Sequence, residues 1–141
     1  MFYRPGIDLE LATLEGESPL EMAVRLNNPW IVGKLMDMNV NFKRKNSQRE
    51  TVLHIALKNQ THKDILKRLT AKIDINEPID EFGSYLNLAI ISGHTDNFFF
   101  LIKELSLNYT KSFDSEGNTC LILAVQYNRG DFLVSILDKL G

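Results

Sequence analysis

The sequence has little of what holds small secreted proteins and thiolate metal sites together. Its 141 residues include a single cysteine, Cys120, which excludes an internal disulfide and any zinc site made of several thiolates. It also has only four prolines and eight glycines, too few for a collagen-like or Pro/Gly-rich low-complexity chain. We therefore expect an intracellular protein of a reducing compartment, the cytoplasm.

Long apolar runs and an excess of one charge are also missing. Apolar runs are short: Phe98–Ile102, for example, has five residues, whereas a membrane-spanning helix needs roughly 20. The N-terminus lacks the charged start and apolar stretch of a secretory signal. Sixteen basic and eighteen acidic side chains leave a formal net charge of -2, so no global field draws the chain to nucleic acid. We expect neither a nucleic-acid partner nor direct membrane insertion.

What the sequence does contain is an internal repeat. Four segments share a hydroxyl residue, a leucine two positions later and an alanine five positions later: Ser18–Val24, Thr51–Leu57, Ser84–Ile90 and Thr119–Val125. The alanines are Ala23, Ala56, Ala89 and Ala124, separated by 33, 33 and 35 residues. Such a period is the signature of supersecondary units that stack in an array.

Each copy predicts a pair of helices. The hydroxyl residue suits a helix N-cap, where its oxygen accepts an otherwise unpaired backbone N–H. The leucine and alanine then share one helical face, and the small alanine allows a neighbouring helix to approach closely. After a turn, a second helix is predicted by apolar residues at helical spacing. These are Ile31, Val32, Leu35 and Met36; Ile65, Leu66 and Leu69; Phe98, Leu101, Ile102 and Leu105; Phe132, Leu133, Ile136 and Leu137. No unit can bury its apolar faces alone, so the units must stack.

The period and these residues resemble the ankyrin repeat. The best single matches are Ser18-Pro19-Leu20, Thr51-x-Leu53-His54-x-Ala56, Gly93-His94 and Asp114-x-x-Gly117-x-Thr119. The resemblance implies an all-α ankyrin-repeat solenoid of stacked helix-turn-helix units with projecting turns, forming a single domain over residues 1–141. We divide it into the tail of a preceding repeat at 1–12 and repeats at 13–45, 46–78, 79–113 and 114–141.

Several positions depart from the ankyrin pattern. Arg49 stands where the second unit should have its turn glycine, so we expect a remodelled or mildly strained turn there. Asp80 and Gly83 lie one residue closer to Ser84 than the pattern requires, which predicts a shortened or bulged turn. Two extra residues in Tyr109–Phe113 account for the spacing of 35.

The ends of the chain also follow the repeat. Gly6–Glu10 corresponds to the closing segment of a unit, and Phe2 and Tyr3 fall on apolar positions of a preceding second helix. We therefore expect a piece of a longer array. The alternative is a short protein with degenerate capping repeats.

The sequence offers no catalytic chemistry. His54 and His94 occupy positions that tie turns together in the ankyrin pattern, and His62 is expected to be a solvated loop residue. Cys120 takes the place of a proline and is expected to fill space, although a helix N-terminus can activate a thiol. Lys43-Arg44-Lys45 reads as a solvated turn rather than a nucleic-acid patch. We expect no enzyme activity, no cofactor and no metal.

The resemblance implies a protein-interaction module that binds through a concave face of turn tips and first helices. Positions free of core packing there predict a partner-binding set of Arg25, Lys58, Glu81, Phe82, Ile91, Gln126 and Tyr127. A locally basic stretch in the first two units and the apolar residues of the last two suggest a partner segment with acidic residues at one end and an apolar anchor at the other. Alternatively, Phe82 and Tyr127 pack against neighbouring turns and units.

We expect a monomeric section of a larger scaffold or adaptor. Two alternatives stay open: a regulatory or targeting region of a multidomain enzyme whose catalytic domain lies elsewhere, and a purely structural spacer. A second surface is also predicted, because Phe99 and Phe100 fall outside the core stripe of their helix and turn partly outward, either as a docking patch or packed under Tyr109–Phe113.

Overall fold

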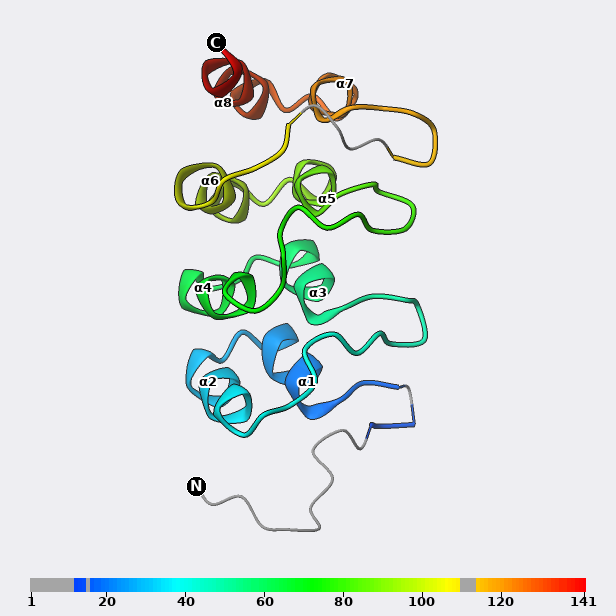
Figure 1. Cartoon of the computed structure of the whole chain (residues 1–141), viewed down its shortest axis with the longest axis vertical. Helices are drawn as coiled ribbons and strands as arrows, with labels where there is room; N and C mark the ends of the chain where they lie inside the picture. The colour runs from blue at the N-terminus through cyan, green and yellow to red at the C-terminus, as the bar shows by residue number, and fades with distance from the viewer. Residues whose placement is uncertain (1–11, 15, 110–113) are drawn as a thin grey trace. The chain divides into compact units, whose positions relative to one another are not determined.

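The computed structural model describes residues 12–14, 16–109 and 114–141, and these residues are organised in helices (Figure 1). In chain order the helices are α1 (Pro19–Arg25), α2 (Pro29–Asp37), α3 (Val52–Lys58), α4 (Lys63–Thr70), α5 (Tyr85–Ser92), α6 (Thr95–Glu104), α7 (Cys120–Gln126) and α8 (Gly130–Leu140). The only β pairing in the described part is an isolated bridge between Ile79 and Gly83. The predicted all-α class is confirmed, while the interpretation of Phe2, Tyr3 and Gly6–Glu10 lies outside the described residues.

The predicted hydroxyl caps start the first helix in three of the pairs. The Oγ of Ser18 accepts the backbone N–H of Glu21 at 3.3 Å, and Ser84 Oγ accepts that of Asn87 at 3.1 Å. Thr119 caps α7 in the same way. Thr51 directly precedes α3, and its own backbone N–H donates to His54 Nδ1 at 3.0 Å. The alanines of the repeat lie at the buried face, at most 4% exposed.

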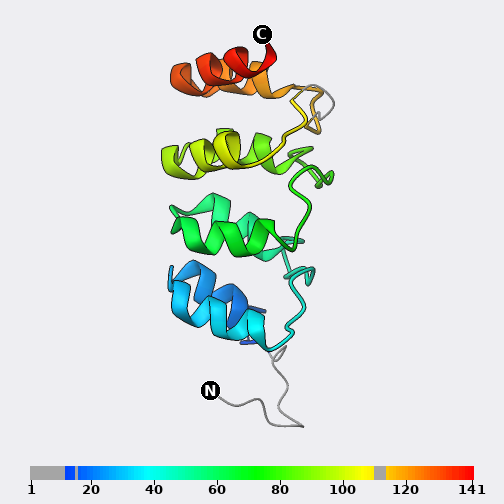
Figure 2. The same cartoon turned by 60° about the vertical axis from the view of Figure 1, so that its left-hand side comes forward.

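The chain forms two compact units, Met1–Ala56 with Thr61–Ile73, and Leu57–Gln60 with Asp74–Gly141. In the first unit α2 packs against both α1 and α4. Figure 2 shows α1 and α2 side by side as a helical hairpin. The buried side chains of the first unit come from both members of the helix pairs: Leu20, Val24, Val32, Leu53, Ile65, Leu66 and Leu69.

In the second unit α5 packs against α6 and α7, while α8 packs against α6 and α7. The first helices α5 and α7 form one layer and the second helices α6 and α8 another (Figure 1). Phe98 and Phe132 stack between the second helices with ring centroids 3.9 Å apart and planes 7° apart. Residues from all four helices complete this core: Leu86, Ile90, Ile102, Cys120, Leu123, Ala124 and Ile136.

The two unusual turns are remodelled as the sequence predicted. Arg49 adopts a φ of 64°, a left-handed conformation that costs a non-glycine residue roughly 1–2 kcal/mol. The Asn46 side chain supports it by accepting the backbone N–H groups of Gln48 and Glu50, each at 2.9 Å. Before α5, Glu81 takes the left-handed conformation with a φ of 67°, and the Ile79–Gly83 bridge closes the shortened turn.

The expectation that both Phe99 and Phe100 turn partly outward is wrong for Phe100, whereas Phe99 keeps part of its surface exposed. Phe100 is 9% exposed. Phe99 is half-buried, with its ring edge-on to Phe98 at 5.2 Å and to Phe132 at 5.8 Å between centroids. Phe99 thus packs at the edge of the ring pair formed by Phe98 and Phe132. With Phe100 buried as well, α6 buries a wider surface than the single apolar stripe expected from its sequence.

Candidate protein-binding surface

Four of the sequence-predicted residues occupy one structural position. Arg25, Lys58, Ile91 and Gln126 each stand seven residues after the hydroxyl that starts their helix, so each lies at or next to the end of a first helix. The side chains of Arg25, Lys58 and Gln126 are exposed, whereas Ile91 is half-buried against the core. Arg25 belongs to the first unit and the other three to the second.

In the first unit, Arg25 is held by an acidic neighbour. It donates to Glu17 through Nε at 2.7 Å and through Nη2 at 2.9 Å. These hydrogen bonds hold the pKa of the Glu17 carboxyl below its usual value, with the charge of the guanidinium adding to the effect against desolvation. The positive charge of Arg25 is therefore largely balanced locally.

Arg44, part of the predicted basic stretch, has a structural role. Its guanidinium pairs with the carboxylate of Glu21, which is 1% exposed, and donates to the carbonyl oxygen of Gly16 at 3.1 Å. Glu21 also completes the cap of α1 by accepting the backbone N–H of Ser18 at 3.4 Å. A buried carboxylate requires such a partner, so the basic stretch of the first unit offers less charge to a ligand than its sequence suggests.

Glu81 and Phe82 form the tip of the turn before α5. Glu81 is exposed and its carbonyl oxygen accepts the backbone N–H of Ser115 from the following turn at 2.8 Å. Phe82 is half-buried, and its carbonyl oxygen accepts the side-chain amide of the fully buried Asn87 at 2.7 Å. The backbone of this tip is thus fixed, while Phe82 as a residue stays partly exposed.

Ile91 and Tyr127 lie at the ends of α5 and α7. Arg129 donates to the carbonyl oxygens of Ile90 and Ile91, both at 3.1 Å, and so satisfies the C-terminal end of α5. Tyr127 is the C-cap residue of α7 and remains 43% exposed. Large aromatic side chains that keep this much exposure are well suited to contact a partner.

The exposure of two further apolar residues on α7 was not predicted from the sequence. Ile122 is 45% and Val125 65% exposed, although the corresponding residues of α5, Asn87 and Ile90, are completely buried. The repeat pattern marks only its leucine and alanine positions as core, so it does not distinguish Ile122 and Val125 from their buried counterparts on α5. Among the described residues, none covers this face of α7.

Two other predictions concern titratable side chains. The expectation for His62 needs correction, because it is not merely a solvated loop residue: its Nδ1 accepts the backbone N–H of Asp64 at 3.1 Å and caps α4. Cys120 is 2% exposed and donates to the carbonyl oxygen of Tyr109 at 3.0 Å. Burial raises the pKa of its thiol, which disfavours the reactive thiolate.

The remaining histidines have structural contacts. His54 is 5% exposed and its Nδ1 lies 3.0 Å from Thr51 Oγ1, whereas His94 Nε2 lies 3.0 Å from the carbonyl oxygen of Lys58. Within the described ranges, no group of three or more His, Cys, Asp or Glu side chains is arranged to hold a metal ion. No helix there is long and apolar enough to cross a membrane.

Comparison with known proteins agrees with the repeat pattern and the helical pairs. A family model described as ankyrin repeats (3 copies) matches residues 20–111 and again residues 53–141. None of the curated protein sequences matches the chain.

Proposed function

Because the chain belongs to the ankyrin-repeat family, whose repeats generally act as protein-interaction modules and are typically non-catalytic, we propose that it is a non-enzymatic binding module of a larger scaffold or adaptor. The partner contacts the concave face of turn tips and first helices. In the second unit this face carries Lys58, Ile91, Gln126 and Tyr127 beside the turn tip of Glu81 and Phe82. We call these six residues the turn-and-helix surface.

The observation that carries the proposal is the partial exposure of Tyr127 at the end of a first helix. Tyr127 is 43% exposed. Its backbone is held at the C-cap of α7, where its N–H donates to the carbonyl oxygen of Leu123 at 2.9 Å and the N–H of the next residue, Asn128, donates to that of Val125 at 3.1 Å. A rigid aromatic side chain loses little conformational entropy on binding. Such residues, when enclosed at the centre of an interface, contribute about 2 kcal/mol or more as hot spots.

The charges of the surface define the partner further. Lys58 is exposed at the end of α3, and Glu81 is exposed at the turn tip. Charges of this kind at the rim of an interface steer the partner and select its orientation more than they add affinity. We expect a partner segment with an acidic residue that meets Lys58 and an apolar side chain that packs on Tyr127.

The test uses a random peptide library displayed on phage and selected against the folded chain. For a selected peptide, Tyr127→Ala should weaken the affinity by about 30-fold, which corresponds to a hot spot of about 2 kcal/mol. The matched control is Leu140→Ala, because Leu140 is 42% exposed but lies on α8, outside the surface. Equal affinities of the Tyr127 and Leu140 variants, with wild-type helicity in both, would exclude Tyr127 from the binding site.

Phe82→Ala gives a second measurement on the same peptide. A loss of affinity shows that the turn tip takes part in binding. An unchanged affinity with reduced thermal stability shows instead that the half-buried ring packs on its own turn and removes Phe82 from the surface.

A further inference from the structure

Trp30, the only tryptophan of the chain, stands where the other second helices have an aspartate. It is the second residue of α2, and the second residues of α4, α6 and α8 are Asp64, Asp96 and Asp131, all exposed. An acidic side chain in the first turn interacts favourably with the helix dipole. Trp30 lacks this benefit and remains 68% exposed, so neither helix formation nor burial accounts for it.

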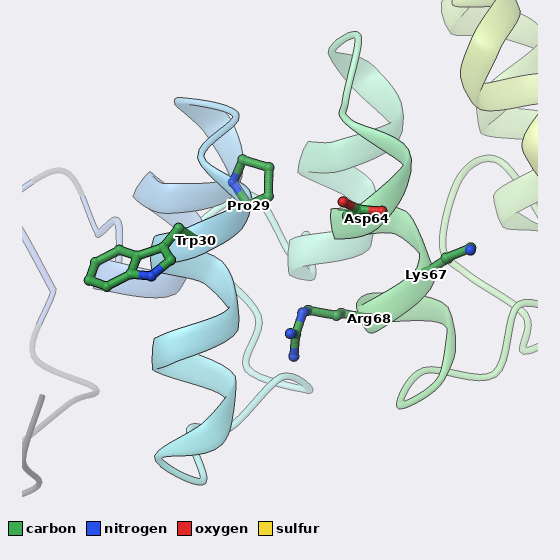
Figure 3. Close-up of a pocket in the computed structure, with 5 residues that line it drawn as sticks. All are labelled: Pro29, Trp30, Asp64, Lys67 and Arg68. Atoms are coloured by element: carbon green, nitrogen blue, oxygen red, sulfur yellow. The ribbon is translucent and has the colours of Figure 1, made fainter.

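An open hollow of about 420 Å³ adjoins Trp30 in the first unit. It is lined by Pro29 and Trp30 from α2 and by Asp64, Lys67 and Arg68 from α4. In Figure 3, Pro29, Asp64 and Arg68 lie between the two helices, while the Trp30 ring and the Lys67 side chain extend outward on opposite sides. A chain segment that crosses the hollow would meet an aromatic ring at one rim and a positive charge at the other.

Gly33 explains how the Arg68 guanidinium reaches α2. A Cβ added at Gly33 would lie 3.2 Å from Arg68 Cζ and from Nη2, closer than ordinary van der Waals contact. A glycine inside a helix lowers its stability relative to alanine, yet here it leaves room for the guanidinium over α2. The nearest acidic group, Asp37, is 3.9 Å from Arg68 Nη1, and both side chains are at least half exposed.

The charge around the hollow is positive, although the whole chain is slightly negative. Helices α2 and α4 carry four basic side chains, Lys34, Lys63, Lys67 and Arg68, and two acidic ones, Asp37 and Asp64. The Lys34 Nζ lies 5.5 Å from the centroid of the Trp30 ring, within the range of a cation–π interaction. Lys34 and Trp30 are thus adjacent on α2, and the Trp30 ring lies at the rim of the hollow opposite Lys67 (Figure 3).

We propose that Trp30, Lys34, Lys67 and Arg68, here called the Trp30 surface, dock an acidic linear segment of a partner protein. An apolar side chain of the segment packs on the Trp30 ring, and its carboxylates bind Arg68 and Lys67, the guanidinium offering two parallel donors to one carboxylate. Asp64 in the lining of the hollow and Asp37 beside Arg68 disfavour a densely anionic lipid surface. This surface belongs to the second helices of the first unit and does not depend on the turn-and-helix surface.

The test uses the fluorescence of Trp30 in the folded chain. The probes are synthetic peptides of Glu and Asp with one Phe or Leu, and control peptides with Lys in place of every acid. We expect a saturable change in emission with the acidic peptides, weakening as salt is added, and no saturable change with the basic ones. Absence of a saturable change with every acidic peptide would overturn the proposal.

Variants then assign the binding to this surface. Arg68→Ala should weaken the affinity about tenfold, whereas Lys72→Ala, which removes an exposed charge of the same sign just beyond α4, should change it less than about twofold. These factors correspond to about 1.4 and 0.4 kcal/mol. Equal effects of the two variants would show nonspecific attraction and refute the assignment.

Gly33→Ala distinguishes a binding role from a structural one. Alanine favours the helix, and the exposed end of Arg68 can move aside, so we expect a higher Tm together with an affinity that is several-fold weaker. An unchanged affinity would show that the position of the guanidinium is immaterial to binding.

Two further measurements test whether the acidic peptides bind at the turn-and-helix surface and whether the Trp30 surface binds a membrane. Tyr127→Ala should leave the binding of the acidic peptides intact, because it alters only the turn-and-helix surface, and a loss would place their binding there instead. Vesicles of phosphatidylserine and phosphatidylcholine should leave the Trp30 emission unchanged. A shift with vesicles but not with acidic peptides would assign the surface to a membrane and contradict the proposal.

Discussion

The contact between Gly93 and Arg129 gives the sharpest test of how the second unit is held together. Gly93 ends α5 in the left-handed conformation, with a φ of 75°. An added Cβ would overlap the Arg129 guanidinium, whose Nε would lie only 2.9 Å away. That guanidinium donates to the carbonyl oxygens of Ile90 and Ile91. Gly93→Ala therefore both strains the backbone and displaces a cap of α5.

Gly117 provides a matched control for the backbone part of this effect. Its φ is 82°, and an added Cβ would meet nothing within 4 Å. Left-handed backbone costs a non-glycine residue roughly 1–2 kcal/mol, partly offset because alanine has less entropy to lose from the unfolded chain. We expect Gly117→Ala to destabilise the fold by about 1 kcal/mol.

In Gly93→Ala, the loss of the Arg129 hydrogen bonds to α5 adds to this backbone cost. Each hydrogen bond to a charged group contributes about 1.5–3 kcal/mol, but the released carbonyl groups regain some hydration at this partly buried site. We therefore expect about 2 kcal/mol for Arg129→Ala and about 3 kcal/mol for Gly93→Ala. The double variant should lose about 3 kcal/mol rather than the sum of 5, because without Arg129 the added methyl group displaces nothing.

Urea unfolding followed by circular dichroism measures all four variants. The free energy of unfolding is compared at an unchanged m-value, so that the denatured state is the same throughout. If Gly93→Ala costs no more than Gly117→Ala, or costs as much without Arg129 as with it, the guanidinium does not cap α5 in the way we describe.

Three further predictions concern charged and titratable groups. Arg44→Met leaves the buried Glu21 carboxylate without its charged partner and should lower the free energy of unfolding by about 3 kcal/mol. In a double-mutant cycle, Glu21→Gln should recover part of this loss, and full additivity of the two substitutions would contradict the pairing. Burial raises the pKa of the Cys120 thiol above 9.0, so the stability that the protonated thiol confers is complete below pH 9.0 and is lost as the pH rises through the folded-state pKa. Cys120→Ala should flatten this alkaline decline of the free energy of unfolding, measured with urea, and an identical decline in the variant would refute the assignment. Backbone hydrogen bonding within its turn lowers the pKa of Asp114 below 3.8, so the stabilisation by its carboxylate is present above pH 3.8 and is lost as the pH falls through the folded-state pKa. Asp114→Asn should weaken the acid dependence of the melting temperature, and the same acid dependence in the variant and the wild type would exclude this role.

The repeat itself could be predicted because its causes are local. A hydroxyl cap, a leucine and an alanine at fixed spacing specify the start and inner face of each first helix, and the structure places Ser18, Ser84 and Thr119 as N-caps. Arg49 was also predictable, since the turn requires a left-handed residue whichever side chain stands there. These features depend on backbone geometry that a short stretch of sequence determines.

The candidate binding residues could be predicted only in part. Their position at the ends of the first helices follows from the same caps, so Lys58 and Gln126 emerge as exposed in agreement with the pattern. Their partners do not follow from it: the pairing of Arg25 with Glu17 and of Arg44 with Glu21 depends on how separate segments fold together. The sequence therefore overstates the charge that Arg25 and Arg44 can offer a ligand.

The sequence by itself determined the helical pairs, their period and the family, because each is encoded in capping and apolar spacing within a few turns. Only the tertiary structure decided which equivalent residues are covered. Ile90 is completely buried while Val125, at the same position of the next repeat, is 65% exposed, and Phe100 is buried against expectation. Exposure depends on what packs across a surface, and the Arg129 cap of α5 has no local sequence signal because it joins groups 39 residues apart.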